Sequence, residues 1–73
     1  MNIVEISLET KNRIYFRFFS DIHITKEFAE VEQGKLGYPK EKYPGKGFEH
    51  EDLLYSASAK AGYKYLITWY VEK

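Results

Sequence analysis

The stretch that decides the fold reads Tyr63-Lys64-Tyr65-Leu66-Ile67-Thr68-Trp69-Tyr70-Val71. It combines β-branched and aromatic side chains with no glycine or proline, which is the composition that a pleated strand favours. The side chains of a strand alternate between its two faces. One face receives Tyr63, Tyr65, Ile67, Trp69 and Val71, and the other receives Lys64, Leu66, Thr68 and Tyr70. Because both faces carry apolar area, we expect an interior strand with one face covered completely and the other in part.

Two further runs near the N-terminus alternate in the same way. The first is expected to direct three apolar side chains toward the core, which are Val4, Ile6 and Leu8. The second covers residues 13–19, and its inward side chains are Ile14, Phe16 and Phe18. Since only a short polar connection separates the two runs, they predict an antiparallel hairpin.

The outer face of this hairpin carries charged and aromatic side chains. Glu5 and Glu9 are expected to lie across from Arg17 and Arg13, as pairs of opposite charge that help to set the register. Three outward residues of the second run are Tyr15, Arg17 and Phe19. They form either a binding platform or ordinary cross-strand packing, and we favour the packing.

A helix is predicted over residues 26–36. Thr25 can cap its first amides, Lys35 suits its last turn, and Gly37 suits the left-handed conformation that ends many helices. Its narrow apolar stripe is formed by Phe28, Val31 and Leu36. We therefore expect Trp69 of the central strand to be buried against Phe28 and Val31.

The segment between the helix and the central strand is harder to assign. Residues 38–48 contain two prolines and two glycines, which predicts a loop. Residues 49–62 fit a strand that returns into the central strand, and they fit a second helix almost as well. We expect a single α+β domain over residues 1–73, with one helix on a small antiparallel sheet in the order ββαββ, and ββααβ as the alternative.

The composition of the chain limits the classes of function that are expected. The chain has 73 residues, no cysteine, and eleven basic and eleven acidic side chains, so neither disulfides nor a strong bulk attraction to nucleic acid is expected. Aromatic residues make up 18% of the chain, which indicates a folded domain. The N-terminus does not read as a signal peptide, and no apolar stretch is long enough for a membrane span. We expect a cytoplasmic protein without membrane contact, and a dimer is compatible with the sequence.

Part of the chain resembles a set of small bacterial and phage-type proteins of uncharacterised activity. The resemblance rests on Gly37-Tyr38-Pro39, on Tyr43-Pro44-Gly45-Lys46-Gly47-Phe48 and on Tyr65-Leu66-Ile67-Thr68-Trp69. It implies a helix before a Pro/Gly-rich loop that ends in Phe, followed by a strand that ends in Thr-Trp, and it implies a mobile-element origin. This chain departs from the set in lacking a cysteine-containing tail and in carrying acidic residues after Phe48.

The loop is the main candidate binding site. Its basic and aromatic residues are Tyr38, Lys40, Lys42, Tyr43, Lys46 and Phe48. Such residues suit contact with a protein, because tyrosine supplies rigid contact area, or stacking of single-stranded nucleic acid, whose phosphates the lysines neutralise. The alternative is that the rings only pack over the sheet while the lysines keep the loop soluble.

No catalytic, cofactor or metal site is expected. His23 follows Asp21 closely, and His50 lies within the acidic run from Glu49 to Asp52, but neither group has the spacing of a zinc site. The acidic run is interpreted as a helix start or a solvated edge, or as a contact patch for a basic partner. We therefore predict a non-catalytic protein-binding module, plausible as a small inhibitor or regulator of phage or mobile-element type, with single-stranded nucleic-acid binding as the alternative.

Overall fold

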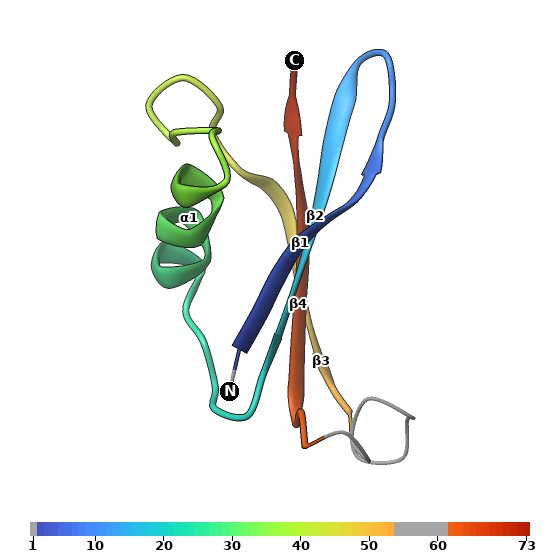
Figure 1. Cartoon of the computed structure of the whole chain (residues 1–73), viewed down its shortest axis with the longest axis vertical. Coiled ribbons are helices and arrows are strands. Elements are labelled where there is room, and N and C mark those ends of the chain that lie inside the picture. Colours follow the sequence, from blue (N-terminus) through green and yellow to red (C-terminus); the bar gives the residue numbers. More distant parts are fainter. Residues whose placement is uncertain (1, 54–61) are drawn as a thin grey trace.

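The computed structural model describes residues 2–53 and 62–73, which form a four-stranded antiparallel sheet with one helix on one of its faces (Figure 1). The elements in chain order are β1 (Asn2–Glu9), β2 (Arg13–Ser20), α1 (Lys26–Lys35), β3 (Lys46–Asp52) and β4 (Tyr65–Glu72). The spatial order of the strands is β1-β2-β4-β3. The predicted α+β class with one helix on an antiparallel sheet is confirmed, the described elements are consistent with the order ββαββ, and nothing in the described residues supports a second helix.

The last strand of the chain is an interior strand, as its composition predicted. β4 pairs antiparallel with β2 on one side and with β3 on the other. Ile67, Trp69 and Val71 are at most 2% exposed, so the predicted inward face is confirmed for these residues. From β2, Phe16 and Phe18 are equally buried beside them, because a directly opposed pair shares a face of the sheet.

A β-bulge at Ser7 changes which face of the sheet the side chains at the end of β1 occupy. Val4 and Ile6 lie opposite Phe18 and Phe16, but the register shifts by one residue before Leu8. The extra residue sends Leu8 to the side of the sheet away from the helix, where its side chain is 56% exposed. The prediction that Leu8 faces the core is therefore wrong.

The same bulge changes the expected charge pairs. Glu5 lies opposite Arg17 and pairs with it, as predicted. Glu9 lies opposite Ile14 instead of Arg13. Its carboxylate forms an ion pair with Lys73, with 2.7 Å between Oε2 and Nζ. The expected pair of Glu9 with Arg13 is therefore wrong, because strict alternation cannot anticipate an inserted residue.

The ends of α1 follow local rules. The hydroxyl of Thr25 accepts a hydrogen bond from the backbone N–H of Phe28 at 3.1 Å, which caps the first turn. Leu36 is the C-cap, and Gly37 follows with φ +100°, a left-handed conformation that glycine adopts without strain. The predicted range of 26–36 is confirmed to within one residue.

The buried side of α1 differs from the predicted stripe. Ala29 and Gln33 are buried against the sheet, and Leu36 packs at the edge of the core. Phe28 and Val31 are 45% and 55% exposed, so the prediction that they cover Trp69 is wrong. The small side chain of Ala29 fits between helix and sheet where a larger one would be overpacked.

β3 begins inside the segment that was predicted as a loop. It starts at Lys46 and includes the acidic run up to Asp52, and it pairs antiparallel with β4. The start of the region that fits either a strand or a helix is therefore a strand. The rest of that region, residues 54–61, lies outside the described residues.

Candidate functional site

One face of the sheet is covered by α1, and no described element lies over the other face (Figure 1). We call this second face the open face. Three rows of its side chains cross all four strands, as the strand register defines, and Arg13 and Glu72 lie opposite each other beyond the first row. The aromatic row is Leu8, Tyr15, Tyr70 and Lys46; the polar row is Glu5, Arg17, Thr68 and Glu49; and the aliphatic row is Ile3, Phe19, Leu66 and Glu51.

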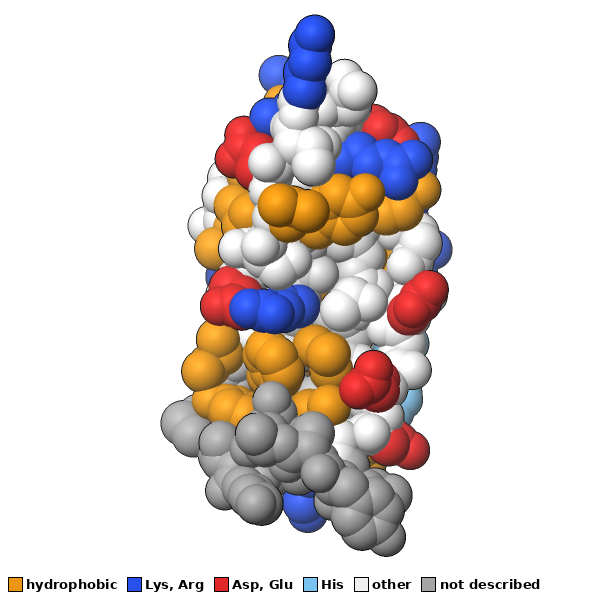
Figure 2. All heavy atoms as spheres, turned by 90° about the vertical axis from the view of Figure 1, so that its right-hand side faces the viewer, with side chains coloured by type: hydrophobic (Ala, Val, Ile, Leu, Met, Phe, Trp, Pro, Cys, Tyr) orange, Lys and Arg blue, Asp and Glu red, His pale blue; other side chains and the backbone are white. Residues whose placement is uncertain are grey.

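Figure 2 shows these rows from outside, as apolar bands separated by charged side chains, with acidic groups at both edges. At the β3 edge, the polar and aliphatic rows end in Glu49 and Glu51. The apolar bands remain accessible at their other end, since Leu8 is 56% and Ile3 is 44% exposed. The open face is thus a mixed surface of the kind that protein interfaces use.

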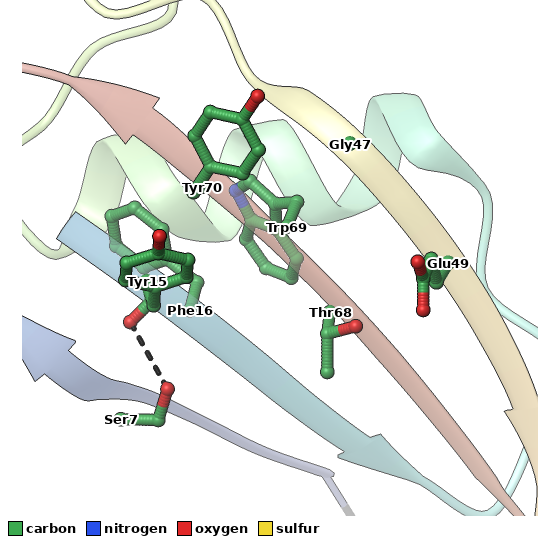
Figure 3. Close-up of a pocket in the computed structure, with 8 residues that line it drawn as sticks. All are labelled: Ser7, Tyr15, Phe16, Gly47, Glu49, Thr68, Trp69 and Tyr70. Carbon is green, nitrogen blue, oxygen red and sulfur yellow. Dashed lines mark hydrogen bonds between the residues drawn. The ribbon is translucent and has the colours of Figure 1, made fainter. Parts of the chain in front are cut away.

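A hollow of about 400 Å³ lies in the open face between the aromatic and polar rows (Figure 3). The rings of Tyr15 and Tyr70 stand at one end of it, with centroids 5.7 Å apart and planes tilted by 44°. Thr68, Ser7 and Glu49 also line it. The bulge contributes directly, because the Ser7 hydroxyl donates a hydrogen bond to the backbone carbonyl of Tyr15 at 3.3 Å.

Gly47 allows Tyr70 to occupy its position. A Cβ atom on residue 47 would lie 2.7 Å from Cε1 of the Tyr70 ring, and φ at this glycine is +65°. Both facts exclude an unstrained side chain there. The ring of Tyr70 therefore lies directly over the backbone of β3.

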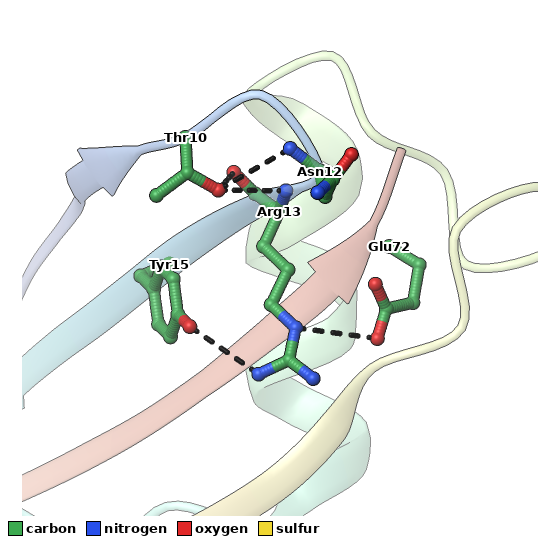
Figure 4. A network of polar contacts seen from close by, with 5 residues as sticks. All are labelled: Thr10, Asn12, Arg13, Tyr15 and Glu72. Atoms are coloured by element: carbon green, nitrogen blue, oxygen red, sulfur yellow. Dashed lines mark hydrogen bonds and ion pairs between the residues drawn. The ribbon is translucent and has the colours of Figure 1, made fainter.

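Arg13 contacts both tyrosines, and Figure 4 shows its contacts with Tyr15 and Glu72. Its Nη1 donates a hydrogen bond to the Tyr15 hydroxyl at 3.3 Å, its guanidinium carbon lies 4.1 Å from the Tyr70 ring centroid, and its Nε lies 3.4 Å from a Glu72 carboxylate oxygen. The bond to Tyr15 and the charge of Glu72 raise the pKa of Arg13 above its ordinary value. The group is charged at any physiological pH, and a cation over a ring face is an attractive arrangement.

The turn before β2 holds Arg13 in place. The hydroxyl of Thr10 accepts hydrogen bonds from the backbone N–H groups of Arg13 and Asn12 at 3.0 and 3.3 Å (Figure 4). The backbone of Thr10 also donates to the carbonyl of Arg13 at 2.8 Å. The guanidinium is thus carried by a tightly hydrogen-bonded turn.

The predicted binding loop contributes its rings to the helix-covered side. Phe48 stacks on Trp69 with centroids 5.5 Å apart, and Phe16 stacks on the other face of that indole at 5.2 Å. Tyr38 lies edge-on to Phe16 at 5.9 Å and to Tyr43 at 5.2 Å. The three predicted site rings are half-buried over the core.

The lysines of this loop are exposed but do not form one cluster. Lys42 lies over the Tyr43 ring at 5.7 Å, and Lys40 belongs to the same turn. Lys46 is separate from them, because it opens β3 opposite Tyr70. Binding by the set Tyr38, Lys40, Lys42, Tyr43, Lys46 and Phe48 stays a prediction.

The two histidines meet, although they are far apart in sequence. The rings of His23 and His50 are stacked with centroids 5.5 Å apart, and the Nε2 atom of His50 lies 3.2 Å from the carbonyl oxygen of Ile24. Parallel stacked rings do not point their nitrogens at a common ion. Within residues 2–53 and 62–73, no group of three or more histidine, cysteine or carboxylate side chains could hold a metal.

Sequence reasoning placed Tyr15, Arg17 and Phe19 on one outward face, and the structure brings them to the open face. It missed the hollow, because Gly47 comes from a segment that was predicted as a loop and Glu49 from one that was left open between a strand and a helix. The alternation that grouped Thr68 with Tyr70 was the available signal for its floor.

No protein family, curated protein or solved structure matches this chain. The resemblance to small phage-type proteins therefore stays a prediction. The single helix in the described part of the chain is too short and too polar to cross a membrane.

Proposed function

We propose that this protein is a non-catalytic module that binds another protein through the open face of its sheet. The observation that carries the proposal is a sheet face free of any described covering element, on which two tyrosines are held by one arginine. Tyrosine and arginine, together with tryptophan, are enriched among the residues that dominate binding energy at protein interfaces.

Preorganisation supports this proposal. Binding loses free energy when mobile side chains become ordered, so a surface that is already ordered binds more tightly for the same contacts. Tyr15 and Tyr70 are each in contact with Arg13, and Arg17 is paired with Glu5. These groups lose little freedom when a partner covers them.

The exposed apolar side chains give the second argument. Leu8 lies in the aromatic row of the open face and Ile3 in the aliphatic row, and each side chain is about half exposed. Covering such area removes it from water and contributes about 25 cal/mol per Å². We propose that the partner is a host or phage protein in the cytoplasm, and that this protein acts on it as a small inhibitor or regulator by occupying one of its surfaces.

A pull-down from a host lysate, followed by mass spectrometry, tests the proposal. Wild-type protein is expected to retain a specific partner at physiological salt, and Leu8→Glu is expected to lose it, because a charge then interrupts the aromatic row. Leu8 is exposed, so this variant should fold, and circular dichroism checks that it does.

The matched control changes the predicted loop instead. The double variant Lys40→Glu, Lys42→Glu alters two exposed lysines and should retain the partner. A partner that is lost from the loop variant and kept by Leu8→Glu would move the binding surface to the loop. Recovery of no specific partner would count against a protein-binding function.

The nucleic-acid alternative has its own test. It requires the loop rings to stack bases, whereas Tyr38 and Phe48 have ring contacts with Phe16 and Trp69. Retention of a single-stranded oligonucleotide on a filter at low salt, lost steeply as salt rises, would favour it. We expect no retention.

A further inference from the structure

Of the charged side chains around the hollow, the arginines have ion-pair partners among the described residues, and the carboxylates of β3 do not. Both arginines of the open face already have carboxylate partners, since Arg17 pairs with Glu5 and Arg13 with Glu72. These four charges cancel in two pairs. A partner therefore meets little net positive charge from them, and an anionic ligand would have to displace a carboxylate to use either guanidinium.

The carboxylates on the β3 side differ. Glu49 lines the hollow and Glu51 ends the next row, and both are exposed. Neither has an ion pair with any residue that the structure describes. Among the described residues, Lys46 is the other charged side chain at the row ends without an ion pair, and it stands opposite Tyr70 rather than lining the hollow. The rim of the hollow on this side is therefore acidic.

The walls of the hollow suit a flat or apolar group. The rings of Tyr15 and Tyr70 form one end, and the Arg13 guanidinium already occupies a face of the Tyr70 ring, 4.1 Å from its centroid. A partner side chain that carries both apolar length and positive charge would match the rings and the rim together.

We propose that the open face binds a basic protein segment, in which an apolar or aromatic side chain enters the hollow beside Tyr15 and Tyr70 while a neighbouring arginine or lysine pairs with Glu49. This inference rests on the proposed function and names the chemistry of the partner. The charge pattern disfavours nucleic acid at this face, because phosphates would lie against Glu49 and Glu51.

Three synthetic peptides of equal length test the inference. They carry a central tryptophan flanked by two arginines, by two serines or by two glutamates, and each is titrated to millimolar concentration into ¹⁵N-labelled protein. The arginine peptide is expected to shift the amide signals of Ser7, Thr68 and Tyr70, and to bind at least threefold more tightly than the serine peptide. Its affinity should fall several-fold between 50 and 500 mM salt.

Matched variants test whether the carboxylate of Glu49 contributes to binding of the arginine peptide. Glu49→Gln is expected to weaken the arginine peptide about threefold or more and to leave the serine peptide unchanged. Glu41→Gln removes an exposed carboxylate of the 38–45 loop, away from the hollow, and should change neither. Equal weakening by the two variants would show that only overall charge matters, and would overturn the inference.

The remaining outcomes separate the inference from the proposed function. If all three peptides shift the open-face signals equally, the face binds but does not select basic segments, and only the inference is wrong. If the glutamate peptide or an oligothymidine shifts them more strongly, or if none of these probes shifts them, the inference is likewise overturned. The proposed function fails separately, if no lysate partner depends on Leu8.

Discussion

The indole Nε1 of Trp69 donates a hydrogen bond to the side-chain oxygen of Gln33 at 2.8 Å, in a core where the two residues are 2% and 0% exposed. The amide nitrogen of Gln33 donates in turn to the carbonyls of Tyr38 and Tyr43, at 2.8 and 2.7 Å. One buried side chain thus links β4, α1 and the loop that follows the helix. Every polar hydrogen in this group has an acceptor, which is the condition for burying it without a large cost.

Replacing Gln33 with Leu should be strongly destabilising. The change leaves the Trp69 N–H and two loop carbonyls without their partner, and an unsatisfied buried polar group costs about 1–3 kcal/mol. We expect a loss of roughly 2–4 kcal/mol in the free energy of unfolding, measured by urea denaturation. A loss below about 1 kcal/mol would show that water replaces the amide.

Trp69→Ala should remove a similar or larger share of the stability. The indole lies between the rings of Phe16 and Phe48, so truncation leaves a cavity between two faces that cannot close. The expected cost is about 3–5 kcal/mol in chemical denaturation. Lys40→Ala and Lys42→Ala are the controls, and each should stay within about 0.5 kcal/mol of the parent. A variant without Trp69 that folds as well as the parent would refute the central position of β4.

The helix surface gives a paired test of which side is buried. Ala29→Leu adds a large side chain to a residue that is 0% exposed, and overpacking of this kind costs about 1–3 kcal/mol. Val31→Leu places the same side chain on the same helix at a site that is 55% exposed, although it adds only one carbon, and should be nearly neutral. Thermal unfolding followed by circular dichroism distinguishes the two variants. Equal effects would favour the stripe that includes Val31.

Two glycines give a matched pair at the site. Gly47→Ala places a methyl 2.7 Å from the Tyr70 ring at a φ of +65°, and should cost roughly 1–2 kcal/mol while it displaces that ring from the hollow. Gly34→Ala meets nothing within 4 Å in a helix, and should be stabilising by up to about 1 kcal/mol. Denaturation measures both free energies, and the aromatic NMR signals of Tyr70 report the ring. An unshifted ring in Gly47→Ala would contradict the contact.

Local signals in the sequence determined most of the architecture. The alternation of Ile67, Trp69 and Val71 predicted the buried face of β4, and Thr25 and Gly37 predicted the ends of α1. These features were readable because each depends on neighbours within a few residues: on the pleat of one strand, or on the unpaired amides and carbonyls at the ends of one helix. The antiparallel hairpin of β1 and β2 was readable for the same reason.

The tertiary structure decided the register and the site. The bulge at Ser7 moved Leu8 to the open face, and the helix buries Ala29 and Gln33 against the sheet, which leaves Val31 exposed and Phe28 only partly covered, against Phe18. No local sequence pattern predicts the facing of Leu8 or the buried side of α1, because each depends on which residues of a strand distant in the sequence lie opposite. The hollow is the clearest case, since its walls come from four strands and exist only when a single register aligns them.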